Sequence, residues 1–222
     1  MITILCSGSR GDFQPYIALA QKLQELGKSV RIAGGKSFED FIKSYGVDFY
    51  PLSADYKNAG IDPKLLQDAQ SSDNPLKMLL TFNKMKKYVF GLTTEMFGAC
   101  QGSELIIYHP GCTIGYFAGE KLGIPSILAA PFPMHKTKEI ASLIAYGKTK
   151  MPKVLSYMLL QGMLWMVGKT GIIEFFKEEY GKLPENFGSP FEKVDKNHPA
   201  IISCSNFVFP RDRKSVVVGK SV

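Results

Sequence analysis

A glycine-rich loop near the amino terminus carries residue types that could do chemistry. Residues 8–12 read Gly-Ser-Arg-Gly-Asp, and they lie between a short apolar run and a run with helical spacing that Pro15 opens. A loop between a buried strand and a helix presents backbone N–H groups and the positive end of the helix dipole to a ligand. The Asp12 carboxylate and the Arg10 guanidinium would lie there, so the loop is predicted to bind an anion, to transfer protons, or both.

Asp12 has two interpretations that the loop alone does not separate. A hydroxyl group is a poor nucleophile until a base removes its proton, and a carboxylate in a cleft can be that base. The ordinary alternative is that Asp12 caps the following helix, which is a common role of Asp. The pKa of a free Asp is about 3.9; a helix N-terminus would lower this pKa, whereas burial would raise it. The residue types alone favour the cap.

The elements that must position this loop alternate between apolar runs and helical patterns. The apolar runs predict strands at residues 2–6, 29–33, 47–50, 105–108, 124–129 and 201–204. Helical spacing predicts helices at 13–26, 37–45, from 75 to about 100, and from the fourth strand to 122. The alternation predicts parallel strands joined by helical crossovers, and hence an α/β fold with a Rossmann-like, doubly wound parallel sheet.

A histidine follows the fourth predicted strand. In a doubly wound sheet, His109 would face the same carboxyl edge at which ligands bind, so it could line a ligand site or be the base itself. Its ordinary interpretation is structural, and His135 in the next loop is a weaker candidate. The cysteines stand far apart and show no ligand spacing with the histidines, so neither a metal nor a disulfide frame is expected. Buried thiols in a reducing, cytoplasmic compartment fit better.

Composition limits the remaining classes of function. The chain has 222 residues, 45% of them hydrophobic, which suffices for one large or two small domains. The net charge is +7, but Lys and Arg are scattered, so no nucleic-acid partner is expected. An apolar, Met-rich helical stretch at 154–167 falls short of the roughly 20 residues that a membrane crossing needs, so at most peripheral membrane contact is expected. This stretch is either a core or interface helix, or the wall of an apolar binding cleft.

The loop lacks the G-x-G-x-x-G spacing of dinucleotide-binding folds, so no nicotinamide cofactor is expected. Residues 8–19, Gly-Ser-Arg-Gly-Asp-Phe-Gln-Pro-Tyr-Ile-Ala-Leu, instead resemble the opening signature of a glycosyltransferase family. This is the amino-terminal domain of GT-B enzymes, the family 28 and UDP-glycosyltransferase superfamily, which includes sterol glucosyltransferases and enzymes that glycosylate antibiotics. Further similar segments are residues 30–33, 45–49, 118–125, 131–137 and 205–211.

The resemblance implies a reaction and a set of site residues. The family transfers a sugar from a nucleotide sugar, expected to be UDP-glucose, to an acceptor hydroxyl, with inversion and without a required metal or other cofactor. The acceptor is expected to be a sterol, a lipid or another apolar molecule. Asp12 stands where plant members have His in a Gly-His-x-x-Pro motif, so the resemblance favours it as the base. The candidate substrate-binding residues are Gly8, Ser9, Arg10, Gly11, His109, Pro133 and Met134.

The domain organisation follows from the same resemblance. Residues 1–211 are expected to form the acceptor-binding domain, whereas residues 212–222 resemble the translation of a sequencing adapter and are expected to be a non-native tail. No Gly-rich donor-binding motif ending in Asp-Gln occurs, so the nucleotide sugar would bind to a second half that this chain lacks. The chain alone is then expected to be inactive. Two alternatives stay open: a stand-alone acceptor-binding module without catalysis, and an unrelated nucleotide-binding α/β domain.

Overall fold

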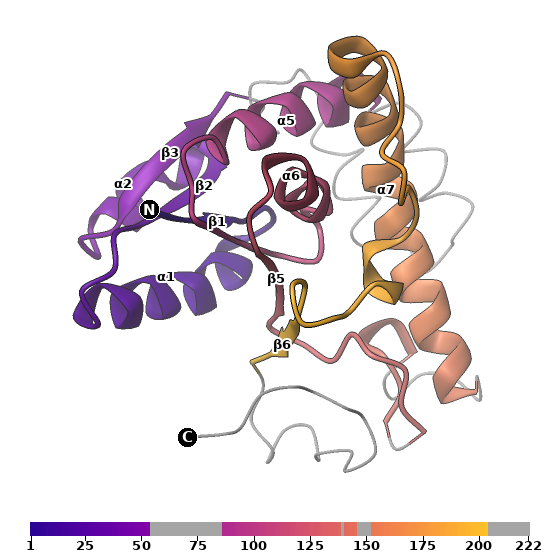
Figure 1. Ribbon diagram of the computed structural model, residues 1–222. Helices are drawn as coiled ribbons and strands as arrows, with labels where there is room; N and C mark the ends of the chain where they lie inside the picture. The colour runs from indigo at the N-terminus through magenta and orange to yellow at the C-terminus, as the bar shows by residue number, and fades with distance from the viewer. Residues whose placement is uncertain (54–85, 139, 146–151, 204–222) are drawn as a thin grey trace.

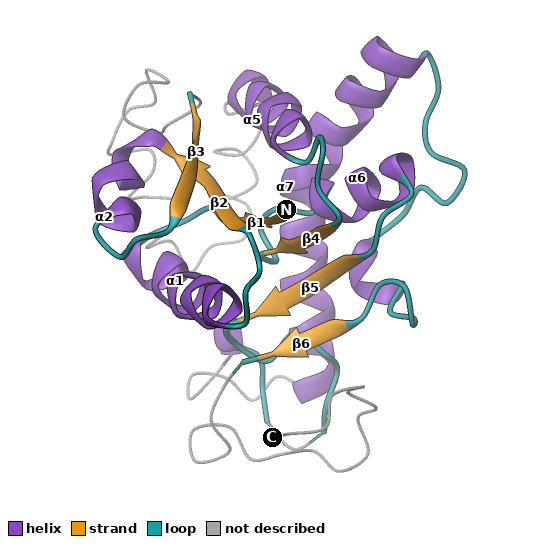
Figure 2. Cartoon of the chain, turned by 60° about the vertical axis from the view of Figure 1, so that its left-hand side comes forward, coloured by secondary structure: helices purple, strands orange, loops and turns teal. Residues whose placement is uncertain are grey.

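The structure of the protein is a computed structural model that describes residues 1–53, 86–138, 140–145 and 152–203. Six strands form one sheet: β1 Ile2–Leu5, β2 Val30–Gly35, β3 Asp48–Leu52, β4 Leu105–Tyr108, β5 Ser126–Ala130 and β6 Ala200–Ile202. The order in the sheet is β3-β2-β1-β4-β5-β6, and every neighbouring pair is parallel. Figure 2 shows β5 and β6 at one edge with their carboxyl ends pointing the same way. The prediction of a parallel α/β sheet is confirmed.

Helices cover both faces of the sheet, as a doubly wound fold requires (Figure 1). The helices are α1 Arg10–Glu25, α2 Glu39–Lys43, α5 Lys86–Ala99, α6 Ile114–Leu122 and α7 Lys153–Tyr180, with 3-10 turns η1 Lys36–Phe38, η2 Leu143–Ala145 and η3 Pro190–Glu192. Alternate residues of β1 divide between two cores. Ile4 packs with the buried side chains of α1 and α2, whereas Leu5 packs with those of α5, α6 and α7. Such burial on both faces explains why the strands are almost wholly apolar.

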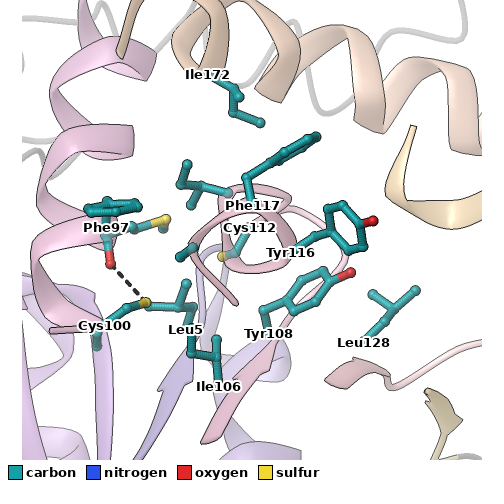
Figure 3. Packing of buried hydrophobic residues seen from close by; sticks show 14 of the residues in the cluster. Leu5, Phe97, Cys100, Ile106, Tyr108, Cys112, Tyr116, Phe117, Leu128 and Ile172 are labelled. Carbon is teal, nitrogen blue, oxygen red and sulfur yellow. Dashed lines mark hydrogen bonds between the residues drawn. The ribbon is translucent and has the colours of Figure 1, made fainter. Parts of the chain in front are cut away.

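The larger core lies between the sheet and the three helices α5, α6 and α7. Figure 3 shows Leu5 and Tyr108 of the strands beneath Phe97 and Phe117 of the helices. The ring of Phe97 also lies 4.7 Å from that of Phe175, which joins α5 to α7. Among the described residues, no helix combines the length and the apolar character needed to cross a membrane.

Several element boundaries differ from those expected. The helix predicted to begin at residue 13 begins at Arg10, because Ser9 and Asp12 form a capping box at its first turn and Pro15 lies inside it. The helix predicted at 37–45 is instead the η1 turn followed by the short α2. The last strand is Ala200–Ile202. Of the helix predicted from residue 75 to about 100, the structure describes only the part that forms α5. Residues 204–211 and the suspected tail at 212–222 lie outside the described residues.

Candidate active site at the switch point of the sheet

The strand order reverses between β1 and β4, and ligands of doubly wound sheets bind at this point, outside the carboxyl ends of the strands. Leu5 at the end of β1 pairs with Tyr108 at the end of β4, and the His109 N–H continues the pairing by donating to the Leu5 carbonyl at 2.9 Å. The loop after β1 and the loop after β4 are therefore neighbours. Nε2 of His109 lies 3.6 Å from Oδ1 of Asp12.

The two oxygens of Asp12 have different surroundings. Oδ2 accepts hydrogen bonds from the Ser9 backbone N–H at 2.6 Å and from the Ser9 hydroxyl at 2.9 Å. Oδ1 faces His109, and the Asp12 side chain keeps 30% of its surface exposed. Asp12 is thus part of a capping box at the start of α1, with Ser9 as the N-cap residue and Asp12 in the first turn, whereas its expected role as the base stays a prediction. The capping box uses Oδ2 of Asp12 and leaves Oδ1 facing His109 in the loop after β4.

Gly8 is required by the position of this carboxylate. Its φ is +128°, a conformation that side chains disfavour. A Cβ atom on Gly8 would also lie 2.3 Å from Oδ2 of Asp12. The glycine therefore allows the Asp12 carboxylate to fold back over the loop and reach Ser9.

The surroundings of His109 fix its orientation and its tautomer. The Gly111 N–H donates to Nδ1 at 3.0 Å, so the proton of a neutral imidazole lies on Nε2, which points toward Asp12. The ring packs edge-on against Tyr16 at 6.0 Å and Phe132 at 6.3 Å between centroids. Nε2 is buried and has no hydrogen-bond partner within the described ranges, which leaves Asp12 as its electrostatic partner.

The electrostatic balance keeps Asp12 ionised. Burial raises the pKa of Asp12, but the nearby His109 imidazole and the hydrogen bonds from Ser9 lower it more, so the net pKa lies below the ordinary value of Asp. At neutral pH the site therefore presents a carboxylate that can accept a proton, beside an imidazole that can stabilise its charge.

The other predicted site residues are distributed between this edge and the core. The exposed Arg10 stacks its guanidinium 4.6 Å from the Phe41 ring centroid, over α2. Gly11 is exposed in the first turn of α1. Pro133 is buried. The Met134 side chain is 1% exposed and belongs to the larger core. The backbone carbonyl of Met134 accepts a hydrogen bond from Gln161 of α7. The structure thus brings Gly8, Ser9, Asp12 and His109 together and directs Arg10 and Met134 elsewhere.

Sequence reasoning missed residues that join the two loops to each other and α1 to the sheet. The thiol of Cys112 donates to the Ser7 hydroxyl at 3.4 Å, and the Tyr16 hydroxyl donates to the carbonyl of Ala129 on β5. A signal was present for Gly111, because a glycine two residues after a histidine at a strand end can offer its N–H to the ring. Across the part of the chain that the structure describes, no group of three or more His, Cys, Asp or Glu side chains is arranged to hold a metal.

Comparisons with known proteins identify the family and the fold. The model of the glycosyltransferase family 28 N-terminal domain matches residues 2–141. A sterol 3-beta-glucosyltransferase from Neurospora crassa is 29% identical to the chain over 221 residues, which is 94% of this chain and 13% of that protein. A sterol 3-beta-glucosyltransferase from Arabidopsis thaliana is 28% identical over 222 residues, which is 95% of this chain and 35% of that protein. The chain therefore spans a minor part of the length of these relatives.

Solved structures with the same fold are also known. The glycosyltransferase SnogD from Streptomyces nogalater superposes with a TM-score of 0.55 at 14% identity, over 97% of this chain and 50% of that one. The glycotransferase of kitacinnamycin gives a TM-score of 0.53 at 13% identity, over 90% of this chain and 45% of that one. At such identities the likeness concerns the fold, and the chain corresponds to about half of each of these structures.

Proposed function

The chain belongs to the glycosyltransferase family 28 N-terminal domain family, and from this premise we propose that it is the acceptor-binding half of an inverting hexosyltransferase. The donor would be a nucleotide sugar, with UDP-glucose the first to test, and it would bind to a carboxy-terminal half outside this chain. The acceptor would be a hydroxyl group of a sterol or another lipid. Relatives named sterol 3-beta-glucosyltransferases support this acceptor class, and family membership replaces the alternative of an unrelated nucleotide-binding domain.

The observation that carries the proposal is the pairing of Asp12 with His109 at the switch point. In the proposed step, the acceptor oxygen forms a bond to the anomeric carbon of the sugar, and the bond from that carbon to the nucleotide diphosphate breaks. The hydroxyl proton passes to Asp12, and the diphosphate leaves with its electron pair. General-base assistance of this kind accelerates a reaction by about 10²–10⁴-fold.

Asp12 fits the role of base better than His109 does. Nδ1 of His109 already accepts the Gly111 N–H, and Nε2 carries the proton of the neutral ring, so no nitrogen is free to accept a further proton. The Asp12 side chain is 30% exposed, so a substrate hydroxyl could approach its carboxylate. His109 then acts as a positioning residue that holds the carboxylate and stabilises its charge.

The lowered pKa of Asp12 has a consequence for where catalysis occurs. A carboxylate with such a pKa is a weak base, and burial under a second domain would raise its pKa toward the working pH. We therefore expect catalysis only in the full-length protein, when the donor-binding half covers the loop after β1. This expectation agrees with the minor share of the relatives' length that the chain spans.

The test is Asp12→Asn in the full-length protein, with an apolar sterol and UDP-glucose as substrates. Asparagine keeps an oxygen for the Ser9 N–H but cannot accept the proton, so kcat should fall by about a hundredfold or more. Asp12→Ala also removes the cap and should lower stability by about 1 kcal/mol as well. Near-normal turnover in Asp12→Asn would leave Asp12 with the cap as its role and would favour a binding module without catalysis by this residue.

A further inference from the structure

Ser7 and Cys112 join the two loops of the candidate active site from below. Ser7 follows β1 and is half-buried, whereas Cys112 follows β4 and is 1% exposed. Burial raises the pKa of the Cys112 thiol to about 12, so the thiol keeps its proton at neutral pH. It donates a hydrogen bond to the Ser7 hydroxyl at 3.4 Å. Cys112 itself is fixed in the larger core, among the side chains drawn in Figure 3.

Gly111 lies between the Ser7 hydroxyl and the His109 ring. A Cβ atom on Gly111 would lie 3.2 Å from Oγ of Ser7 and 3.1 Å from Nδ1 of His109, so a side chain there would displace one of them by a few tenths of an ångström. The backbone of Gly111 does not itself require glycine, because its φ is not positive. The close approach of the two loops therefore explains this glycine. Ser7, Gly111 and Cys112 are called the latch below.

The latch sets the orientation of the His109 ring. The Cys112 N–H donates to the His109 carbonyl at 2.7 Å and the Gly111 N–H donates to Nδ1 at 3.0 Å, which closes a tight turn around the ring. A ring turned by 180° would present a C–H group to Gly111 and leave that N–H without its acceptor, which is unfavourable. The edges of Tyr16 and Phe132 limit the ring on other sides.

The other groups around Asp12 contribute no charge that could replace His109. Burial raises the pKa of each of the remaining titratable neighbours, which stay uncharged at neutral pH: Cys6, Tyr16 and Cys112. The Arg10 guanidinium lies over the Phe41 ring. Burial raises the pKa of Asp12 itself, whereas His109 and Ser9 lower it. Because Ser9 lies in the same loop as Asp12, the contribution from the second loop depends on the place of the His109 ring.

We propose that Ser7, Gly111 and Cys112 are positioning residues, which hold Nε2 of His109 toward the Asp12 carboxylate and thereby keep that carboxylate ready to accept a proton. The latch contacts His109 and acts through it. Its catalytic meaning rests on the proposed function, whereas its effect on His109 and Asp12 does not. Both effects are therefore measurable in the full chain without a substrate.

The first test is ¹⁵N NMR of the imidazole nitrogens at alkaline pH, where histidine rings are neutral. We expect the proton of His109 on Nε2. His198 provides an internal reference with the opposite tautomer, because its Nδ1 faces the Lys193 carbonyl and its Nε2 faces the Tyr108 hydroxyl. His109→Gln assigns the signals by removing one set. A proton on Nδ1 of His109 would overturn the proposal.

The second test is Gly111→Ala, with the Asp12 pKa measured by ¹³C NMR of its carboxyl group. The new Cβ shifts the His109 ring, so the His109 signals should move and the Asp12 pKa should rise by about 0.5 or more. Adding Ser7→Gly removes one of the two close contacts and should reverse part of the rise. Unchanged His198 signals would show that the fold is intact.

The matched control is Gly188→Ala, another loop glycine, whose new Cβ would meet Lys193 no closer than 3.5 Å. It should leave the Asp12 pKa unchanged. If Gly111→Ala does not fold, Cys112→Ala and Cys112→Ser test the latch, because only serine keeps a donor for Ser7 and should keep the low Asp12 pKa. An Asp12 pKa that stays unchanged in Gly111→Ala, or that rises equally in the control, contradicts the proposal.

The catalytic meaning is tested in the full-length protein with UDP-glucose and a sterol. The base must be ionised, so activity falls as the pH drops through the Asp12 pKa, and a raised pKa moves this acid limb of kcat/KM to higher pH. Gly111→Ala should show that movement with little change in KM, whereas a loss of folded protein would lower kcat without moving the limb. A raised Asp12 pKa with an unmoved limb would confirm the latch and overturn Asp12 as the base.

Discussion

At the scale of single residues, the site depends on how one carboxylate divides its oxygens. Oδ2 of Asp12 completes the first turn of α1, and Oδ1 meets the imidazole of His109. The cap therefore does not compete with the proposed catalytic role, because it holds the carboxylate at a fixed place and rotation. A catalytic group held by packing and hydrogen bonds is preorganised and needs little rearrangement when substrate binds.

Gly8→Ala should damage this arrangement. The new Cβ would meet Oδ2 of Asp12 at 2.3 Å, in a backbone conformation with φ of +128°. We expect a loss of stability of about 1–3 kcal/mol in denaturant unfolding, with a loss of turnover in the full-length protein. The control is Gly11→Ala, because a Cβ there would meet only the Ser9 hydroxyl, at 3.7 Å, inside a regular helix. An equally destabilised control would show that the loop tolerates no side chain at all.

The sequence indicated both Asp12 and His109, but their pairing could not be predicted from it. Their contact depends on β1 and β4 being neighbours in register, and alternation of strands and helices does not determine which strands pair. The tautomer of His109 depends on the direction of one N–H, that of Gly111. The burial of the Met134 side chain in the larger core could not be predicted either, because an apolar residue after a strand can turn to either side.

At the scale of elements, α7 and α6 approach each other closely at one glycine. A Cβ on Gly168 would lie 2.1 Å from the Thr113 hydroxyl oxygen, next to the first turn of α6. Apolar periodicity predicted a helix in this region but gave no indication of the approach, since a glycine inside a helical pattern has several possible causes. The helix also extends to Tyr180, beyond the apolar stretch, because the buried Phe175 and Phe176 continue its contact with α5 and α6.

Gly168→Ala and Gly162→Ala should therefore have opposite effects. The first should destabilise the fold by about 1–3 kcal/mol, because α7 must move away from Thr113. The second should stabilise it by about 0.5–1 kcal/mol, because no atom lies within 4 Å of the new Cβ and alanine favours helix. Urea unfolding of both variants measures the difference. Similar changes in the two variants would mean that α7 is free to shift at Thr113.

At the scale of the whole molecule, the last strand is fastened to the sheet through a buried histidine. Nε2 of His198 lies 2.5 Å from the Tyr108 hydroxyl and Nδ1 lies 2.8 Å from the Lys193 carbonyl, so the neutral ring is satisfied on both sides. Tyr116 packs edge-on against this ring, and Asp195 and Lys193 lie close by in the same turn. Burial lowers the pKa of His198, although the Lys193 carbonyl and nearby acidic groups oppose this.

The stability of the fold should therefore fall in mild acid. The unfolded chain protonates this histidine at its ordinary pKa of about 6.5, whereas the folded chain does so only at lower pH. Stability is then fully present above about pH 6.5 and declines as the pH falls toward the folded pKa. Urea unfolding at several pH values measures this decline. His198→Phe should be less stable at neutral pH but should show a smaller pH dependence. The remaining dependence includes His135, whose pKa burial also lowers, and, at about pH 4 and below, Asp12, whose pKa is lowered by His109 and Ser9. An unchanged dependence would contradict the role of His198.

The fold class could be predicted at this scale because both sheet faces are covered, and the strands are therefore short, apolar and separated by helical patterns. The order of the strands could not be predicted, since it depends on contacts between segments that are distant in the sequence. The assignment of residues 1–211 to one domain remains a prediction, because the described residues end at 203.

The central place of β1 also sets the timing of assembly during synthesis. β1 leaves the ribosome well before its neighbour β4, which begins only at Leu105. At roughly 5–20 residues per second, the half of the site that carries Asp12 waits on the order of 5–20 s for the half that carries His109. During that interval one edge of β1 lacks its partner strand, which is a hazard for association with other nascent chains. Slow translation before β4 would lengthen this exposure, and a chaperone that covers the β1 edge would shorten its consequences.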